Sequence, residues 1–350
     1  MNNFNKYFLF FILIAFIALP IFCIASPKPA AEAGLPLEKI FYMNQSGEKS
    51  GIASLQKNAD KIDILAPQFY AVSAKLQLTG GLDTQLKNII SQKKIKVMPL
   101  VANAGFKQDV IHNLLVSPTA QDTVIKSLVS AALKNGYIGW QFDFENISYL
   151  DKDLFSAFVE KTAAALHKNN LILSVAAVSR TSDYEDTDAF KNWGGVYDYA
   201  RLAKATDFIS LMTYDDPKSV GPVASVPFIK SVLNYVKGKI PPEKLSLGIP
   251  LYYWGWCADT SQKVVSSGTY NRLLTIMDNF RCNLGFDSAL GASWLTYSYQ
   301  DQQYQIWYQD KLSFQNKLDL IKQNNFRGFS AWVLGIEDPG IWSALAKTVI

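Results

Sequence analysis

Three polar residues alternate with aromatic ones in the segment from Gly136 to Asn146. Because successive side chains of a strand point to opposite faces, Gln141, Asp143 and Glu145 would share one face of a strand. Burying a carboxylate is costly unless it is paired or protonated, and two neighbouring carboxylates raise the pKa of one of them. One acid can then stay protonated near neutral pH, as a general acid must. The alternative is a polar network between strands that carries out no chemistry.

The elements that must position these acids repeat along the chain. Short apolar segments rich in β-branched residues alternate with longer amphipathic ones, which is typical of βα units and a parallel sheet. Helices are expected between the strands, one with its N-cap at Asp151 or Asp153 and another ending at Gly238. The eight expected strands are residues 40–43, 62–70, 96–101, 138–144, 171–178, 208–214, 245–251 and 328–334.

Eight such units in about 310 residues predict an α/β fold, a single (β/α)8 TIM barrel rather than an open doubly wound sheet. No glycine motif for nucleotide phosphates follows any expected strand. In such a barrel the functional side chains project from the carboxyl ends of the strands. Asp143 and Glu145 fall at that end of the fourth strand.

The segment from Trp254 to Gln309 is too long for a simple loop after the seventh strand. Its alternating, aromatic-rich stretches predict a small α+β insertion over the carboxyl end of the barrel, where it would form one wall of a groove. The insertion contains Cys257 and Cys282, the two cysteines that remain if Cys23 leaves with an export signal. In an exported chain this even pair predicts one disulfide, and two buried thiols are the alternative.

The N-terminal segment from Tyr7 to Ala25 is an almost unbroken apolar run that follows Lys6. It predicts a signal peptide over residues 1–25, cleaved after Ala25, then a linker over 26–38 and a folded barrel over 39–350. A retained membrane anchor and a lipoprotein acylated at Cys23 are the alternatives. We therefore expect an exported protein of the periplasm, cell envelope or medium, which contacts the membrane only through this segment if it is uncleaved.

Composition excludes several classes of protein. The chain has 350 residues, of which 49% are hydrophobic and 18% charged, so it is neither disordered nor a small disulfide scaffold. Its net charge of +4 and the absence of a long basic run give no reason to expect a nucleic-acid partner. His112 and His167 are the only histidines and belong to no metal-binding or serine-hydrolase motif, so neither a metal nor another cofactor is expected.

The strand motif resembles D-G-x-D-x-D-x-E of glycoside hydrolase family 18, the chitinase family, with Asp143 and Glu145 on its last two acids. Ile138 and Gln141 stand where the motif has its other acids, and the amide is similar to the spore-germination branch of cortex-lytic N-acetylglucosaminidases. The similarity extends over about residues 39–347 of the sequence. It includes the sixth-strand motif M-x-Y-D at Met212–Asp215, the stretch Gly248–Tyr252, and the eighth strand at Phe326–Gly335 with its tryptophan, Trp332.

This resemblance implies a retaining hydrolysis assisted by the substrate. Glu145 would protonate the glycosidic oxygen while the carbonyl oxygen of the sugar's own 2-acetamido group attacks the anomeric carbon. Asp143 would orient the acetamido N–H and share a proton with Glu145, and Tyr214 would donate a hydrogen bond to the acetamido oxygen. Trp332 would lie under the reacting sugar.

Other residues are expected to bind the substrate, each with a structural alternative. Tyr214 could instead be an ordinary strand tyrosine, and Tyr70 and Trp332 could be packing residues. Gln141 is expected to replace the missing acid as a hydrogen-bond partner of Asp143. Five insertion aromatics could be sugar platforms or insertion core. The expected substrate-binding residues are Gln141, Met212, Asp215, Trp332 and Tyr70, and the insertion aromatics are Trp254, Trp256, Tyr297, Tyr299 and Trp307.

Together these features predict an exported hydrolase of β-1,4-linked N-acetylglucosamine polymers, either chitin or the glycan strands of peptidoglycan. Glu145 would be its general acid and base. A lectin-like barrel that binds such glycans without cutting them is one alternative, although the presence of Glu145 argues against it. A hydrolase of the N-glycan core is the other alternative.

Overall fold

The computed structural model describes residues 36–45, 48–257 and 264–346. The expected signal peptide, its cleavage site and Cys23 lie outside these residues. Within the described ranges, no helix combines the length and the apolar character that crossing a membrane requires.

Eleven strands form one sheet in the order β4-β3-β6-β7-β8-β9-β10-β16-β1-β2-β5, and neighbours pair in parallel except for the antiparallel pair β3–β4. All eight expected strands are present, so their prediction is confirmed. The bounds are β1 (Glu38–Asn44), β2 (Ile64–Gln68), β3 (Tyr70–Val72), β4 (Leu78–Gly80), β5 (Lys96–Val97), β6 (Leu100–Asn103), β7 (Gly139–Asp143), β8 (Ile172–Val178), β9 (Phe208–Met212), β10 (Leu245–Pro250) and β16 (Gly328–Trp332).

The barrel closes through two strands that are each broken in the middle. The expected second strand is divided at Phe69 into β2 and β3, and the third is divided at Met98 and Pro99 into β5 and β6. Pro99 has no N–H to give to a ladder, which is one reason for the second break. β2 pairs with β5 at one end of the strand order, and β3 pairs with β6 near the other end. The expected second and third strands therefore pair with each other at both ends of the order, which closes the barrel. The predicted (β/α)8 barrel is confirmed.

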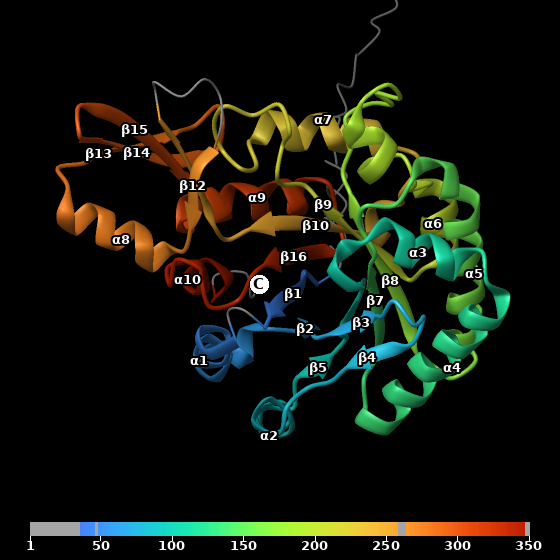
Figure 1. The fold of residues 1–350 in the computed structure, drawn as a ribbon. Coiled ribbons are helices and arrows are strands. Elements are labelled where there is room, and N and C mark those ends of the chain that lie inside the picture. The colour runs from blue at the N-terminus through green and yellow to red at the C-terminus, as the bar shows by residue number, and fades with distance from the viewer. Residues whose placement is uncertain (1–35, 46–47, 258–263, 347–350) are drawn as a thin grey trace, which may run out of the picture. The chain divides into compact units, whose positions relative to one another are not determined.

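Helices flank the strands on the outside of the barrel (Figure 1). Several begin at side-chain caps, such as Asp83, Ser117 and Ser225, each of which accepts a hydrogen bond from a backbone N–H three residues later. The α-helices around the barrel are α1 (Glu48–Asn58), α2 (Thr84–Lys93), α3 (Gln108–Leu115), α4 (Pro118–Asn135), α5 (Lys152–His167), α6 (Tyr199–Ala205), α7 (Val226–Val236), α9 (Lys311–Gln323) and α10 (Ile341–Ala346). Shorter 3-10 or π turns are η1 (Ala59–Lys61), η2 (Ala104–Phe106), η3 (Tyr149–Asp151), η4 (Phe190–Gly194) and η5 (Pro242–Lys244).

The two expected helix boundaries have different outcomes. Helix α7 ends before Gly238, whose φ of 77° suits a glycine, as predicted. Asp151 stands at the N-cap position of α5, but its carboxylate makes no capping hydrogen bond. It pairs instead with Nδ1 of His112 at 2.9 Å.

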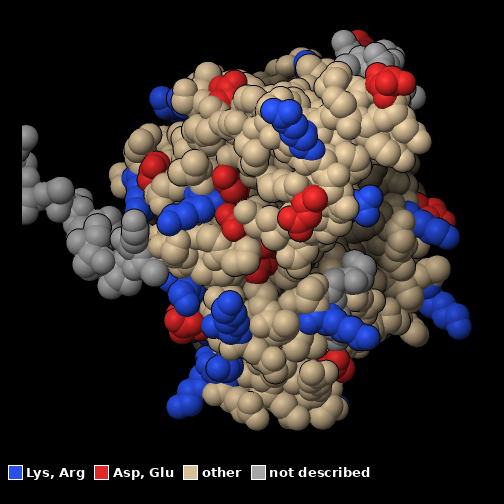
Figure 2. Space-filling model, turned by 90° about the vertical axis from the view of Figure 1, so that its left-hand side faces the viewer, with Lys and Arg blue, Asp and Glu red and all other residues tan. Residues whose placement is uncertain are grey.

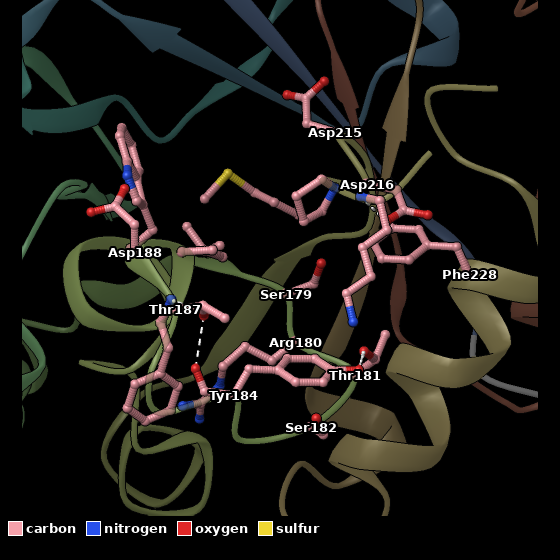
Figure 3. A pocket seen from close by; sticks show the side chains of 18 of the residues that line it. Ser179, Arg180, Thr181, Ser182, Tyr184, Thr187, Asp188, Asp215, Asp216 and Phe228 are labelled. Carbon is pink, nitrogen blue, oxygen red and sulfur yellow. Dashed lines mark hydrogen bonds between the residues drawn. The ribbon is translucent and has the colours of Figure 1, made fainter. Parts of the chain in front are cut away.

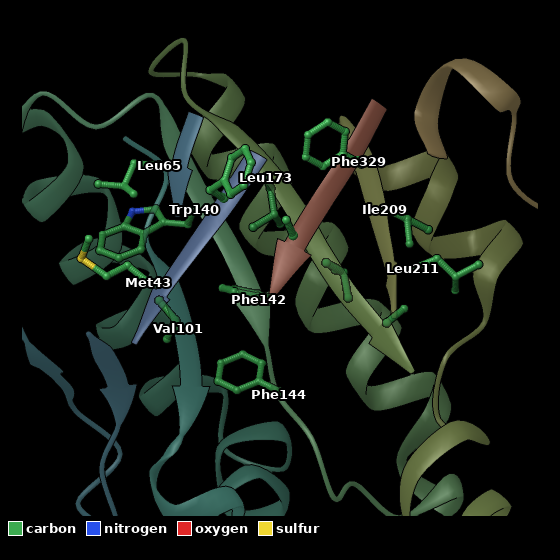
Figure 4. Close-up of a cluster of buried hydrophobic side chains, with 14 of the residues drawn as sticks. Met43, Leu65, Val101, Trp140, Phe142, Phe144, Leu173, Ile209, Leu211 and Phe329 are labelled. Atoms are coloured by element: carbon green, nitrogen blue, oxygen red, sulfur yellow. The ribbon is translucent and has the colours of Figure 1, made fainter. Parts of the chain in front are cut away.

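Two apolar layers hold the barrel together. The larger layer lies between the sheet and the helices and includes Trp140, Phe142 and Phe329 (Figure 4). The smaller layer fills the barrel interior and includes Tyr42, Met98 and Phe208. In β7 the aromatic residues face the helices, as the alternation predicts, and Trp140 Nε1 donates to the carbonyl of Leu128 at 2.9 Å. Burying each such side chain contributes about 1.5–3 kcal/mol.

The segment between β10 and α9 forms a second, antiparallel sheet with one helix. Its strand order is β12-β11-β15-β14-β13. Figure 1 shows these strands and α8 standing to one side of the barrel strands. The bounds are β11 (Tyr253–Cys257), β12 (Val264–Gly268), α8 (Tyr270–Asn279), β13 (Asn283–Asp287), β14 (Ala292–Tyr299) and β15 (Gln302–Tyr308).

The structure has no disulfide between Cys257 and Cys282, so the expected bond is not formed. Cys257 ends β11, whereas Cys282 directly precedes β13, and β15 and β14 lie between these two strands. Three inter-strand spacings correspond to about 14 Å, twice the Cα separation of about 7 Å that a disulfide tolerates. The Cys257 thiol donates to Gln302 Oε1, and the Cys282 thiol donates to the carbonyl of Phe280.

Charged side chains of both signs are interspersed over the face shown in Figure 2. Elsewhere on the surface, side chains of α4, α5 and α6 form ion pairs, such as Arg201 with Glu160 at 2.7 Å and Lys161 with Asp122 at 2.8 Å. Exposed pairs of this kind contribute little to stability. This is the pattern of a solvated surface.

Strand β7 begins at Gly139, which lies close to the backbone of Ile172 in β8, and this contact yields a stability prediction. A Cβ on Gly139 would lie 2.0 Å from the carbonyl oxygen of Ile172. We expect Gly139→Ala to lower the free energy of unfolding by about 3 kcal/mol or more, because backbone must move to admit the methyl group. Chemical denaturation of the purified variant measures this loss.

Gly136→Ala is the matched control for that experiment. Gly136 also has a positive φ, 68°, but a Cβ there would meet nothing within 4 Å. Its substitution should cost only the left-handed backbone penalty of about 1–2 kcal/mol. Equal losses for the two variants would contradict the proposed close contact between β7 and β8.

Candidate active site

Asp143 and Glu145 face one cavity at the carboxyl ends of the barrel strands. Asp143 is the last residue of β7 and Glu145 follows two residues later. Asp143 is 3% exposed, and Glu145 is half-buried. We call this space the central cavity. It has a volume of about 230 Å³ and is lined by Tyr42, Gln68, Leu100, Phe106, Asp143, Glu145, Ala176, Met212, Tyr214, Asp215 and Trp332.

The two carboxyl groups ionise in a fixed order. Burial raises the pKa of Asp143, and hydrogen bonds with Gln68 and with Glu145 oppose that rise. Burial raises the pKa of Glu145 as well, and the negative charge of Asp143 and the hydrogen bond to it raise it further. Asp143 is therefore the first to ionise, and Glu145 keeps its proton to higher pH.

The backbone of Glu145 is clamped by a buried amide. Asn103, at the end of β6, accepts a hydrogen bond from the N–H of Glu145 at 3.0 Å and donates one to its carbonyl at 2.9 Å. The hydroxyl of Tyr197 donates to the carbonyl of Phe144 at 2.8 Å. The segment after β7 is thus fixed from two sides, which orients the Glu145 side chain. The sequence analysis missed Asn103, although a buried asparagine at a strand end is a detectable signal.

Gln141 does not contact Asp143, contrary to the expectation. Its Nε2 donates to Ser174 Oγ at 2.7 Å and to Ser210 Oγ at 2.9 Å. Ser330 continues this network through 2.7 Å hydrogen bonds with Ser210 and with Ser246. Gln141 is fully buried and lies below the central cavity, of which it is not a lining residue. Strand β7 therefore uses this amide to tie together the barrel interior.

The partner of Asp143 is Gln68, at the end of β2. Gln68 Nε2 donates to Asp143 Oδ2 at 2.7 Å. Tyr42 of β1 also lines the central cavity, and burial raises its pKa, so its hydroxyl stays protonated. The sequence analysis missed both residues. A polar glutamine at the carboxyl end of an apolar strand is the signal that points to Gln68.

Tyr214, Met212, Asp215 and Trp332 all line the central cavity, and their expected roles in catalysis and substrate binding stay predictions. Burial raises the pKa of Tyr214 well above its usual range, so its hydroxyl remains a hydrogen-bond donor. Its ring lies close to β10 because Gly248 has no side chain: a Cβ there would lie 2.9 Å from Tyr214 Cε1. Asp215 has a φ of 56° and accepts a hydrogen bond from the hydroxyl of Tyr252.

Tyr70 does not line the central cavity but a neighbouring one, together with Gln68 and Asn103, so its expected role in substrate binding stays a prediction. Its ring packs edge-on against Trp140, and its hydroxyl lies 2.9 Å from that of Tyr137. The break at Phe69 interrupts the alternation, because Phe69 and Tyr70 both belong to the apolar layer under the helices. A continuous strand would have placed Tyr70 on the same face as Gln68.

Two further cavities continue from the central cavity on either side. The β3–β6 cavity, of about 310 Å³, shares Gln68 and Phe106 with it and is also lined by Tyr70 and Asn103. The β8–β9 cavity, of about 530 Å³, shares Glu145, Met212, Tyr214 and Asp215 with it. The three spaces therefore form a row along the carboxyl ends of the strands, with Asp143 and Glu145 in the middle.

The β8–β9 cavity lies between the segments that follow β8 and β9 (Figure 3). Arg180 stands at its wall, with its guanidinium 5.0 Å from the ring centroid of Tyr199, and donates to the carbonyl of Tyr197 at 3.0 Å. Lys218 Nζ lies 3.8 Å from the ring centroid of Tyr184. Phe228 of α7 adds an apolar side chain to the wall. The space is mixed in character, with apolar rings beside charges of both signs.

The insertion aromatics pack mainly on one another. Trp256 and Trp307 are buried, and Trp256 Nε1 donates to the carbonyl of Gly221 at 2.9 Å. Tyr297 stacks on Tyr304 with ring centroids 5.1 Å apart. Of the described insertion residues, none lines any of the three cavities, so the expected groove wall is not found at them. These contacts favour the core interpretation for Trp256, Trp307 and Tyr297, whereas Tyr299 is exposed.

The histidines form isolated pairs with acids. His112 pairs with Asp151, and His167 Nε2 pairs with Asp207 at 2.9 Å. In the part of the chain that the structure describes, no three or more His, Cys, Asp and Glu side chains are grouped so as to hold a metal ion.

Comparison with known proteins assigns this geometry to a family. The model of glycosyl hydrolases family 18 matches residues 39–337. The uncharacterized glycosylase YvbX of Bacillus subtilis (strain 168) is 28% identical over 314 residues, which cover 86% of this chain and 89% of that protein. The cortical fragment-lytic enzyme of the same organism is 26% identical over 89% of this chain and 74% of its own length.

The fold is similar to that of solved chitinases. The crystal structure of a chitinase from Chromobacterium violaceum ATCC 12472 superimposes with a TM-score of 0.79 at 24% identity, over 89% of this chain and 99% of that one. At this identity the likeness shows the fold alone.

The buried carboxyl pair should lower stability as pH rises. In the unfolded chain both acids ionise near pH 4, whereas folding raises the pKa of both, so the native state binds more protons above that pH. Stability is therefore lost as pH rises from about 4 toward the raised pKa values. We expect Glu145→Gln to be more stable than wild type by about 1 kcal/mol or more at pH 8, and similar to it at pH 4. Thermal unfolding at the two pH values measures the difference.

Glu160→Gln serves as the control with the opposite sign. The hydrogen bond from Arg201 lowers the pKa of Glu160, so its ionised form favours folding. That variant should gain no stability at pH 8. If Glu145→Gln were also no more stable than wild type at pH 8, the pKa of Glu145 would not be raised by folding. The ionisation order of the pair would then be wrong as well.

Proposed function

Because the chain belongs to glycosyl hydrolases family 18, we propose that it hydrolyses β-1,4-linked N-acetylglucosamine polymers with Glu145 as general acid and base. One observation carries the proposal. Asp143 and Glu145 lie side by side at one strand end, in one cavity, and Glu145 is the acid that keeps its proton. A protonated carboxyl group open to a cavity is what a glycosidic oxygen needs in order to leave.

The nucleophile would come from the substrate. Two enzyme carboxylates that act as acid and nucleophile must flank the scissile bond from opposite sides, whereas Asp143 and Glu145 come from the same strand. The carbonyl oxygen of the 2-acetamido group would instead form a bond to the anomeric carbon as the bond to the leaving oxygen breaks and Glu145 gives up its proton. Water would then attack the same carbon as its bond to the acetamido oxygen breaks, and the water would give a proton to the Glu145 carboxylate. The product keeps its anomeric configuration.

Neutral and ionised groups of the cavity suit this step. Asp143, ionised, would accept a hydrogen bond from the acetamido N–H, and the Tyr214 hydroxyl would donate one to the acetamido oxygen. Trp332 is half-buried at the cavity wall and would pack on the apolar face of the sugar ring. Each positioned hydrogen-bonding group of this kind is worth about 10²-fold in rate.

A polymer substrate is supported by the row of three cavities. A small molecule would need only the central cavity, whereas a glycan chain would also occupy the β3–β6 and β8–β9 cavities on either side of Glu145. The similarity to a cortical fragment-lytic enzyme favours peptidoglycan strands over chitin. Export through the apolar segment at residues 7–25 would bring the enzyme to such a substrate.

The test is the release of reducing ends from a chitin hexamer and from peptidoglycan. Glu145→Gln should lose at least about 10²-fold in kcat on the substrate that wild type cuts, because the amide has no proton to give. Glu160→Gln, an exposed acid of α5, is the matched control and should keep wild-type activity. If wild type binds both glycans and cuts neither, the lectin-like alternative holds instead.

A second variant tests the source of the nucleophile. Asp143→Ala should also lose most activity, since the acetamido group loses its orienting partner. Addition of azide should not restore it. If azide restored activity and gave a glycosyl azide of inverted configuration, an enzyme carboxylate would be the nucleophile and the proposed mechanism would be wrong.

A further inference from the structure

Gln68 makes a direct contact with one of the two acids, and it comes from a different strand. Its Nε2 donates to Asp143 Oδ2 at 2.7 Å. On the adjacent strand β1, the residue that pairs with Gln68 is Asn44. The side chain is half-buried and belongs to both the central and the β3–β6 cavities. It therefore touches Asp143 at the wall of the space that would hold the substrate.

Strand β7 cannot supply this hydrogen bond itself. Gln141 Nε2 donates its two hydrogen bonds to serines of β8 and β9, which leaves its amide below the cavity. Ile138, at the other position where an acid would be expected, has an apolar side chain packed in the barrel interior. The donor for Asp143 thus has to reach it from outside β7, and Gln68 does so.

No cation is available at this place. The described residues that line the central cavity include no lysine, arginine or histidine. The charged or titratable groups that face Asp143 are Glu145 on its own segment, Tyr42 from β1, Tyr214 and Asp215 after β9, and Tyr197 after η4. Burial raises the pKa of each of the three tyrosines, so these groups are neutral or acidic. Ionised Asp143 consequently depends on neutral hydrogen-bond donors.

An amide N–H donates and cannot accept a proton. Asp143 Oδ2 must therefore act as an acceptor, and the one proton of the pair is left between Asp143 Oδ1 and Glu145. A carboxyl group in place of Gln68 could take up that proton itself. The neutral amide excludes this.

We infer that Gln68 is a positioning residue: it holds Asp143 as the acceptor and so leaves the shared proton on Glu145, where the proposed hydrolysis needs it. The inference rests on the proposed function for its catalytic consequence. The contact itself has a consequence for stability that does not depend on activity.

The kinetic test is the pH profile of kcat/KM. Removal of the donor in Gln68→Met, which nearly preserves volume, should shift the acidic limb upward by about one pH unit, because Asp143 then ionises less readily. Gln68→Ala is a second variant and should shift it in the same direction. A merely structural role would lower activity by the same factor at every pH, and that result would overturn the inference.

Gln121→Met is the matched control. Gln121 also donates one hydrogen bond through Nε2, to the carbonyl of Leu115 at 2.8 Å, but it lies in the first turn of α4 and lines none of the three cavities. Its substitution should leave the pH profile unshifted. A shift as large as that of Gln68→Met would overturn the inference.

Stability separates this inference from the proposed function. Gln68→Met should be more destabilised relative to wild type at pH 8, where Asp143 is ionised, than at pH 4, and in an Asp143→Asn background this pH dependence should disappear. If wild type is inactive but the variants show this pH-dependent stability, the proposed function is wrong and the contact between Gln68 and ionised Asp143 is supported. If wild type is active but the loss of stability caused by Gln68→Met is the same at both pH values, the proposed function is supported and the role of Gln68 is wrong.

Discussion

Two carboxyl groups, largely out of water and with one proton between them, are the feature on which the rest of the site depends. Burial penalises the ionised form of both Asp143 and Glu145, and the charge of the first penalises ionisation of the second. Their neighbours are hydrogen-bonding amides and hydroxyls rather than cations. Asn103 fixes the backbone of Glu145, and Gln68 fixes the carboxylate of Asp143. Burying the two carboxyl groups lowers the stability of the folded protein, and it leaves one acid protonated near neutral pH.

The barrel makes this arrangement possible by using both faces of β7. Trp140 and Phe142 anchor the outer face under the helices, while Gln141 ties the inner face to serines of the neighbouring strands. A strand held so firmly can present costly groups at its end. The site is therefore a local exception that the surrounding apolar layers and the polar network below it support.

Sequence periodicity could predict on which face of a strand each side chain lies. It could predict less about the hydrogen-bond partners of these side chains. The eight strands, the insertion and the placement of Asp143 and Glu145 followed from period and spacing. The partners of Gln141 and the role of Gln68 depend on which strands are adjacent and in which register, and a single chain does not encode that locally. Tyr70 lies outside the central cavity because a break in the second strand shifts the alternation by one residue. The predicted disulfide is absent for a similar reason: an even number of cysteines does not show that two strands of the insertion sheet lie between Cys257 and Cys282.

The most direct test of the account is to observe the Glu145 carboxyl group itself by ¹³C NMR titration of the labelled protein. The account predicts that it titrates well above the usual range of a glutamic acid, and that its pKa falls toward that range in Asp143→Asn, where the neighbouring charge is gone. A Glu145 carboxyl that titrates as an ordinary glutamic acid, or that is unaffected by Asp143→Asn, would contradict the central claim that the pair holds one proton and keeps it on Glu145.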